Sequence, residues 1–97
     1  MDRLEAMRVF ASVVEASSFT KAAAALRISK TSATQLVQRL EAHLRVKLLN
    51  RTTRLVSPTA EGRTYYAHVV RVLADIEDAE DRLAAAGTAP RGGVRVG

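Results

Sequence analysis

The segment Ser17–Leu44 reads SSFTKAAAALRISKTSATQLVQRLEAHL, and it predicts two helices joined by a turn of about four residues. Ser17 and Ser18 offer hydroxyls that can cap a helix running through Thr20 to Leu26, in which four consecutive alanines favour helix and close packing. Ser29 can cap the next helix, whose apolar residues recur at steps of four, three and four: Ala33, Val37, Leu40 and Leu44. This pattern is typical of a helix-turn-helix unit.

The sequence on either side of this unit predicts one further helix and a hairpin. Before it, apolar residues at three-four spacing indicate an amphipathic helix with one buried face: Leu4, Met7, Phe10, Ala11 and Val14. After it, Val46–Asn50 and Arg54–Ser57 are predicted to form two short strands around the polar turn Arg51-Thr52-Thr53-Arg54. Such a hairpin beside a helix-turn-helix unit is a wing.

A long helix is predicted to follow the hairpin. Pro58 favours an extended Ser57, and Thr59 can cap a helix from Ala60 to about Ala86 that would be roughly 40 Å long and end at Gly87. The predicted fold is therefore mainly α. Residues 1–58 form a winged helix-turn-helix of three helices and a two-stranded wing, and residues 59–87 form a long dimerising linker helix.

One face of this long helix is apolar along its whole length. The residues of the face repeat at four-three spacing, and we expect a homodimer through Tyr65, Val69, Val72, Ile76, Ala79 and Leu83. The alternative is packing against the first helix of the same chain. That helix of roughly 15 residues would span roughly 22 Å and cover about half of the apolar face, so a second chain is expected on the rest.

The positive charge of the chain is concentrated in its middle. The net charge is +5, and residues 27–63 hold eight basic and two acidic side chains, a net charge of +6. Most of the acids come later, at Asp75, Glu77, Asp78, Glu80 and Asp81. A basic middle followed by an acidic arm suits a partner such as nucleic acid, which would contact only the middle, while a solvated surface is the alternative interpretation.

Several classes of protein are disfavoured by the composition. The chain has no cysteine, so it has no disulfide, thiolate zinc site or cysteine nucleophile. His43 and His68 have no third ligand or nucleophile nearby in the sequence, and we expect no metal site and no enzyme activity. No apolar run reaches the ~18 residues of a membrane span and the N-terminus does not resemble a signal peptide, so a cytoplasmic protein without a membrane partner is expected.

The run SSFTKAAAALRISKTSATQLVQRLEAHLRVKLLNRTTRLVSPTAEG, residues 17–62, resembles the N-terminal domain of LysR-type transcriptional regulators. The usual pattern of that family is SFT-x-AA-x-x-L, then S, RLE-x-x-L, L-x-x-R and LT-x-x-G. The resemblance implies a dimer that binds inverted-repeat operator DNA, with one helix of each chain in the major groove and the wing in the minor groove.

The resemblance also has implications for the rest of the protein. Residues 88–97, TAPRGGVRVG, look like the hinge and first strand of an effector-binding domain that would follow. A small-molecule inducer would bind that domain, so this part of the protein needs no cofactor, and the full-length protein is expected to be a tetramer.

The resemblance assigns DNA-contacting roles to residues in three places. Opposite the apolar stripe of the third helix lie short polar or basic side chains, which suit base edges and phosphates: Lys30, Thr31, Ser32, Thr34, Gln35 and Gln38. Ser18 and Thr20, at the start of the second helix, are expected to contact phosphate, although helix capping is their alternative role. Arg51 and Arg54 flank the wing turn and suit a narrow minor groove, while an ion pair within the domain is the alternative for Arg51.

The sequence departs from the family pattern at four positions. Gln35 stands in place of a common arginine, which changes the bases that can be read, and Leu49 and Pro58 replace a common phenylalanine and leucine. Arg45 replaces a common glycine, so a left-handed helix end there would cost about 1 kcal/mol or more. Glu41 and Arg45 are also spaced for a surface ion pair.

Two competing functions remain at this point. The first is a helical protein-interaction module that does not bind DNA, in which the long helix is functional and the basic middle is incidental. Binding that is insensitive to salt would favour that module. The second is another winged-helix family, the MarR type, which fits less well because its dimers use helices at both chain ends.

Overall fold

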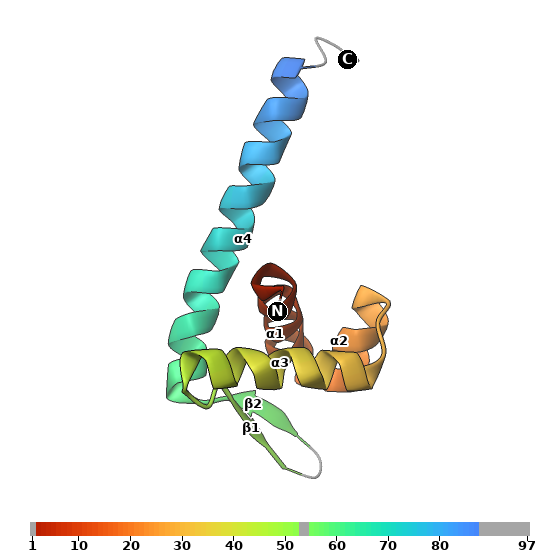
Figure 1. Cartoon of the computed structure of the whole chain (residues 1–97), viewed down its shortest axis with the longest axis vertical. Coiled ribbons are helices and arrows are strands. Elements are labelled where there is room, and N and C mark those ends of the chain that lie inside the picture. The colour runs from red at the N-terminus through yellow and green to blue at the C-terminus, as the bar shows by residue number, and fades with distance from the viewer. Residues whose placement is uncertain (1, 53–54, 88–97) are drawn as a thin grey trace.

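The computed structural model describes residues 2–52 and 55–87, and it has the predicted winged-helix class. Helices α1 (Arg3–Ala16), α2 (Phe19–Leu26) and α3 (Lys30–Leu44) are followed by strands β1 (Leu49–Arg51) and β2 (Val56–Pro58) and by helix α4 (Ala60–Gly87). The molecule is 51 Å long because the second half of α4 projects beyond the other elements (Figure 1).

Helix α1 lies at the centre of the domain and packs against α2, α3, α4 and β2. This explains why its predicted apolar face was incomplete. Phe10 and Ala11 are buried as expected, but Leu4, Met7 and Val14 are only partly buried. The most deeply buried residues also include Ala6, Val9 and Val13, because neighbouring elements cover α1 on more than one side.

The helices begin at side chains that accept backbone N–H bonds. Asp2, Ser18 and Ser29 are the N-caps of α1, α2 and α3, and they accept from Glu5, Lys21 and Ser32 at 3.0–3.1 Å. The predicted caps at Ser18 and Ser29 are therefore confirmed. Each cap satisfies an N–H that has no partner within its own helix, which places the helix starts at these residues.

The same three helices end at residues with left-handed backbone conformation, and none of these residues is glycine. Ser17, Arg27 and Arg45 have φ values of 53°, 60° and 56°. At Arg45, where the family pattern has glycine, the N–H groups of Arg45 and Val46 both donate to the Glu41 carbonyl and close the helix. The helix end is thus formed in spite of the side chain.

The expected ion pair between Glu41 and Arg45 was wrong. The Glu41 carboxylate turns toward the chain that follows α3 and accepts the N–H groups of Leu48 and Leu49 at 2.8 and 3.2 Å. Two bonds from backbone N–H groups to a carboxylate are stronger than an exposed contact between flexible side chains.

The wing, residues 49–58, is a two-stranded antiparallel sheet in which Asn50 pairs with Ser57. Its first strand begins three residues later than predicted, because the backbone before it is bound elsewhere. The N–H groups of Leu48 and Leu49 donate to the Glu41 carboxylate. The carbonyls of Lys47 and Leu48 accept hydrogen bonds from the hydroxyl and the N–H of Thr59. The second strand begins at Val56, because the backbone of Leu55 is bound to Thr52. The Leu55 carbonyl accepts from the N–H and the hydroxyl of Thr52, and the Leu55 N–H donates to that hydroxyl.

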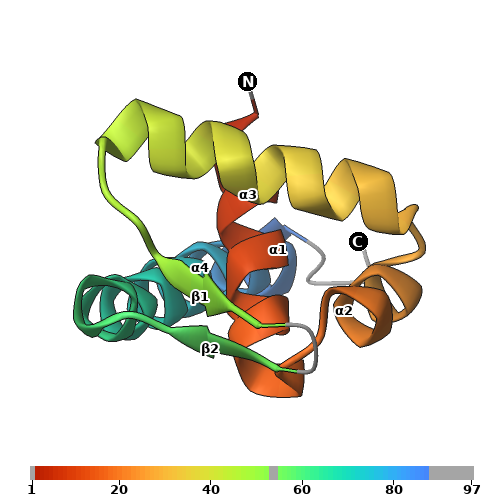
Figure 2. The same cartoon turned by 90° about the horizontal axis from the view of Figure 1, so that it is seen from below.

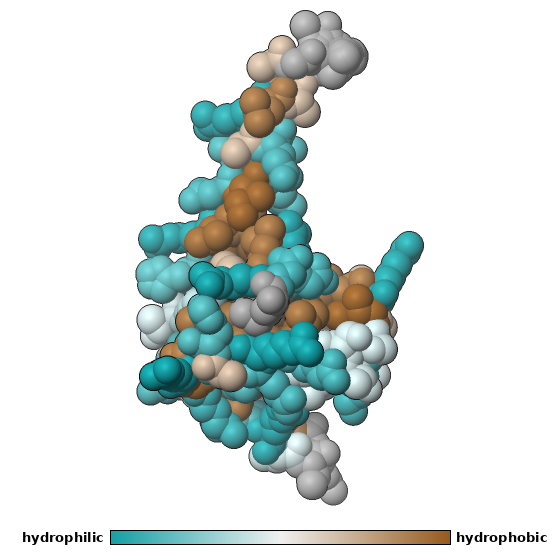
Figure 3. Space-filling model, in the orientation of Figure 1, coloured by the Kyte–Doolittle hydropathy of each residue, from teal (hydrophilic) through white to brown (hydrophobic). Residues whose placement is uncertain are grey.

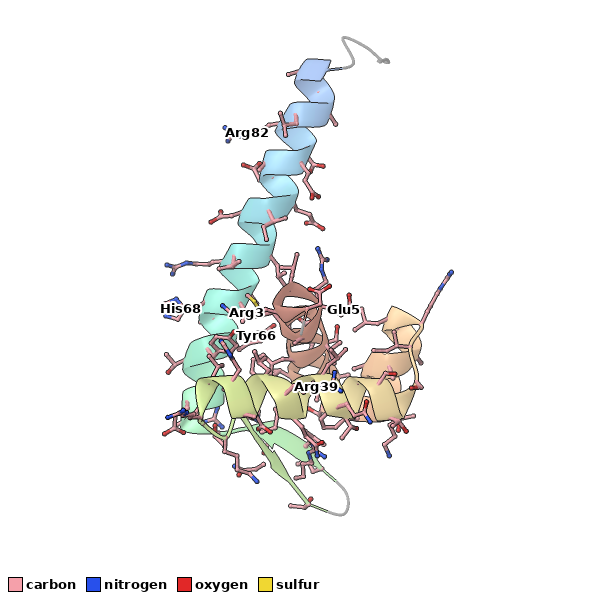
Figure 4. All side chains as sticks on the ribbon, viewed as in Figure 1. Arg3, Glu5, Arg39, Tyr66, His68 and Arg82 are labelled. Carbon is pink, nitrogen blue, oxygen red and sulfur yellow. The ribbon has the colours of Figure 1, made fainter. Side chains whose placement is uncertain are left out.

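The first half of α4 is fixed to the domain. Thr59 accepts the N–H of Gly62 as the cap of α4, the rings of Tyr65 and Phe10 lie 5.6 Å apart, and Val69 is fully buried. The Tyr66 hydroxyl donates to the Glu15 carboxylate of α1 at 2.8 Å, and this hydrogen bond, with partial burial, raises the pKa of Tyr66 (Figure 4). Burial likewise raises the pKa of Tyr65, although the positive charge of Arg3 opposes that effect.

Gly62 lies where α4 passes closest to the chain that enters the wing, and we predict that Gly62→Ala is destabilising. A Cβ at this position would overlap the backbone carbonyl oxygen of Leu48. Alanine is the better helix former by about 1 kcal/mol, but overpacking of this kind costs about 1–3 kcal/mol. Urea unfolding should show a lower midpoint for Gly62→Ala and little change for the neighbouring exposed control Glu61→Ala. An unchanged or higher midpoint for Gly62→Ala would contradict the close approach.

Arg45 has a left-handed backbone conformation, so replacing it with glycine is predicted to increase the stability of the fold. Arg45→Gly should raise the free energy of unfolding by up to about 1 kcal/mol, because glycine adopts this conformation without steric cost. The matched control is Ala42→Gly, which adds glycine at an exposed right-handed position of the same helix and should lower stability by about 1 kcal/mol. Thermal unfolding of both variants tests this, and destabilisation by Arg45→Gly would contradict it.

Candidate nucleic-acid interface

The start of α2, the start of α3 and the wing surround one open hollow of about 330 Å³. Figure 2 shows the wing extending beside α1 toward the start of α2. The hollow, called here the α2–wing hollow, is lined by Ser17, Ser18, Phe19, Thr20, Lys30, Thr34, Arg51, Thr52, Leu55 and Val56. Five residues that the sequence predicted as DNA contacts, taken from three separate segments, are among them.

A second open depression runs along the outer side of α3. It is lined by Lys30, Thr31, Thr34, Gln35 and Gln38, which we call the α3 face. Lys30 and Thr34 belong to both depressions, so the two surfaces are continuous. Among the described residues, neither depression is lined by a carboxylate, and every polar side chain that lines them can donate a hydrogen bond.

The residues predicted to contact DNA differ in their exposure and in their hydrogen bonds within the domain. Ser18 is half-buried and is the N-cap of α2, whereas Thr20 is exposed and is not the cap. Ser32 is exposed but lines neither depression, and its hydroxyl accepts a hydrogen bond from Ser29 at 2.9 Å. Arg54 lies outside the described residues.

Arg51 ends β1 with its guanidinium 4.5 Å from the centre of the Phe19 ring. Within residues 2–52 and 55–87, no carboxylate lies within ion-pair distance of Arg51. The contact of Arg51 within the domain is therefore a cation–π contact with Phe19 of α2 and not the ion pair considered from the sequence.

Five of the ten acidic residues lie away from both depressions. Asp75, Glu77, Asp78, Glu80 and Asp81 belong to the second half of α4, which projects from the domain (Figure 1). One of them, Asp78, pairs with Arg82 at 3.0 Å, and Arg82 points away from the domain (Figure 4). An anion at the α3 face therefore meets hydroxyls, amides and basic groups.

Other kinds of site are not apparent in the described part of the chain. In that part, no group of three or more histidine, cysteine, aspartate or glutamate side chains is arranged to hold a metal ion. Over residues 2–52 and 55–87, no helix combines the length and apolarity needed to cross a bilayer.

Comparison with known proteins identifies the family. The model of the bacterial regulatory helix-turn-helix proteins of the LysR family matches residues 4–63, which include α1–α3, the wing and the start of α4. The chain belongs to the LysR family.

Curated LysR-type relatives match almost the whole chain. The sequence is 46% identical over all 97 residues to the HTH-type transcriptional activator AaeR of Escherichia coli K12, and 45% identical over 96 residues to an HTH-type transcriptional repressor of Pseudomonas aeruginosa. The chain spans 31% and 30% of the length of these two relatives.

Solved structures of LysR-type DNA-binding domains have the same fold. The complex of the BenM DNA-binding domain with catB site 1 DNA matches with a TM-score of 0.79 and 35% identity, over 81% of this chain and 89% of that one. The complex of the CbnR DNA-binding domain with DNA matches with a TM-score of 0.81 and 34% identity, over 86% of this chain and 95% of that one.

The predicted dimerisation seam of this LysR-family chain is divided between two environments. Tyr65 is partly buried and Val69 fully buried in the core of their own domain, so the core already covers these two predicted seam residues in part or in full. Further along α4, Ile76 is partly buried, Val72 is 41% exposed and Leu83 is 73% exposed. Figure 3 shows apolar surface continuing up α4 beyond the domain.

Sequence reasoning missed Phe19, Thr52 and Leu55, which line the α2–wing hollow together with the predicted contacts. Phe19 was part of the family motif, but its contact with Arg51 joins residues 32 positions apart and leaves no periodic signal. Leu55 is 56% exposed, and an apolar residue in a wing turn could have been noticed as unusual.

Proposed function

We propose that this chain is the sequence-specific DNA-binding domain of a cytoplasmic bacterial transcriptional regulator, and that residues 1–58 carry the DNA contact. The α3 face would enter the major groove, with Ser32 beside it, while Ser18 and Thr20 meet phosphate and Arg51 and Arg54 of the wing approach the minor groove. The observation that carries this proposal is the convergence of α2, α3 and the wing on one continuous surface, to which the described residues contribute no carboxylate.

The dimensions and chemistry of α3 support the proposal. The major groove of B-DNA admits one α-helix, and its base edges are read by amide, hydroxyl and basic side chains. The α3 face presents these groups from the first turns of the helix, the part that commonly meets bases in helix-turn-helix proteins. The related BenM and CbnR domains were solved as complexes with DNA.

We propose further that the chain forms a homodimer through the part of α4 from Val72 onward and thereby binds inverted-repeat DNA. Val72 and Leu83 expose apolar surface there, and Ile76 and Ala79 belong to the same helix face. In a protein as long as its relatives, residues 88–97 would lead into an effector-binding domain that binds the inducer and allows a tetramer. Those ten residues lie outside the described part of the chain.

The first test introduces a negative charge at the α2–wing hollow. Ser18→Asp keeps a good N-cap, so the stability of the fold should be retained, but the carboxylate would repel phosphate. We expect weaker DNA binding for Ser18→Asp and almost no change for Ala85→Asp, which adds the same charge at the far end of α4. Fluorescence anisotropy with a labelled duplex measures both.

Salt dependence separates this function from that of a protein-interaction module. A domain that contacts several phosphates should lose orders of magnitude in affinity between ~50 and 200 mM salt. A DNA affinity that changes neither with salt concentration nor with Ser18→Asp would contradict the proposal.

The dimer is tested at Leu83, because this side chain is exposed in the single chain and a charge there should not disturb folding. Leu83→Glu is expected to shift the dimer toward monomer, since each buried leucine contributes about 1.5–3 kcal/mol. Ala74→Glu places the same charge near the opposite side of α4 and serves as the control. Light scattering that finds the Leu83→Glu protein still fully dimeric would exclude this part of α4 as the interface.

The identity of Gln35 predicts a base preference. Glutamine offers one donor and one acceptor, which match adenine N6 and N7, so Gln35 should favour adenine at one base pair. Gln35→Ala should cost about 1–3 kcal/mol on the best duplex, and Gln35→Arg should shift the preference toward guanine. Binding of the three proteins to four duplexes that differ at that pair measures this. A preference that both substitutions leave unchanged would mean that Gln35 reads no base.

A further inference from the structure

The contact between Phe19 and Arg51 lies inside the proposed DNA-binding surface. The guanidinium carbon of Arg51 is 4.5 Å from the centre of the Phe19 ring, and both residues line the α2–wing hollow. Phe19 is the first residue of α2 and Arg51 the last residue of β1, so the contact joins the wing to the helix-turn-helix unit.

The two partners differ in their freedom to move. Phe19 is only 5% exposed and belongs to the domain core, next to the Ser18 cap that fixes the start of α2. Arg51 is exposed and has no carboxylate partner among the described residues. The buried ring is therefore the fixed partner, and it restrains a long side chain that would otherwise sample many rotamers.

An arginine held over a ring keeps its hydrogen-bonding capacity. The N–H groups of a guanidinium lie in its plane and point outward from its edge, so a ring contacting the flat face uses none of them. Hydroxyls of Ser18, Thr20 and Thr34 and the ammonium group of Lys30 line the same hollow. Together these groups offer a phosphate several donors and two positive charges.

We propose that Phe19 is a positioning residue for DNA binding. Its ring holds the Arg51 guanidinium at the edge of the minor groove, so that the free N–H edge meets a phosphate of the strand that borders this groove beside the starts of α2 and α3. This inference rests on the proposed function, and it assigns to Phe19 a role separate from its contribution to the core. Because the contact is with phosphate, it acts on duplexes of any sequence.

A double-mutant cycle tests the proposal with the full 97-residue chain and a labelled duplex of mixed sequence. Phe19→Leu keeps an apolar side chain but removes the ring, and Arg51→Ala removes the guanidinium. We expect Phe19→Leu to weaken binding about two- to fivefold when Arg51 is present, the range expected of an exposed cation–π contact, and to have no effect when residue 51 is alanine. Arg51→Ala should also reduce the slope of log affinity against log salt by about one.

Loss of core packing is controlled separately. Val13→Ala removes a fully buried side chain from α1 and should lower the thermal midpoint without changing DNA affinity at temperatures where the protein is folded. Equal weakening by Phe19→Leu in both backgrounds, or no weakening in either, would overturn the positioning role.

A measurement without DNA distinguishes failure of this inference from failure of the proposed function. In the NMR spectrum of the free protein, the side-chain protons of Arg51 should be shifted upfield by the Phe19 ring, and Phe19→Leu should abolish the shift. Absence of the shift in a chain that binds DNA overturns the inference alone. A shifted Arg51 in a chain that shows no salt-dependent DNA binding overturns the proposed function, and with it the phosphate contact.

Discussion

The backbone of Leu48 is the point at which the helix-turn-helix unit, the wing and α4 are joined. Its N–H donates to the Glu41 carboxylate of α3, its carbonyl accepts the N–H of Thr59 before α4, and its side chain is buried. A buried backbone group without a partner would cost about 1–3 kcal/mol, so these bonds strongly disfavour other paths for the chain after α3. The absence of a side chain at Gly62 lets α4 begin against this carbonyl, and the direction of α4 follows.

The features of the fold that depend on local spacing could be predicted from the sequence. The apolar stripe of α3, its cap at Ser29 and the extent of α4 each follow from residues within one helix, and the structure agrees to within a residue. Features that depend on tertiary partners could not be predicted. The strand limits were wrong because Glu41 and Thr59 bind the backbone that would have extended β1. The predicted face of α1 was incomplete because several elements cover that helix.

In the candidate site, too, features set by spacing within one helix could be predicted, and features set by tertiary contacts could not. Periodicity placed Thr34, Gln35 and Gln38 on the outer face of α3, because that question concerns one helix only. Family resemblance suggested the wing arginines, but the position of Arg51 over Phe19 depends on a contact between β1 and α2. Periodicity within a single element has no means of indicating such a contact. The surface that unites Ser18, Lys30 and Arg51 exists only after α1 has brought the three segments together.

The two halves of α4 are under different physical constraints. The first half, with Tyr65 and Val69, contributes to the core of the domain, so substitutions there should act first on folding. From Val72 onward, α4 has apolar side chains at Val72 and Leu83 that are exposed in the single chain, together with the cluster of acids that begins at Asp75. Carboxylates beside an exposed apolar stripe keep α4 soluble and disfavour contact with phosphate, but they do not prevent the stripe from packing on another helix. A single helix can thus anchor the proposed DNA-contacting surface at one end and offer the proposed dimer interface at the other, because core packing occupies its first part, and exposed apolar surface and negative charge share the part that follows.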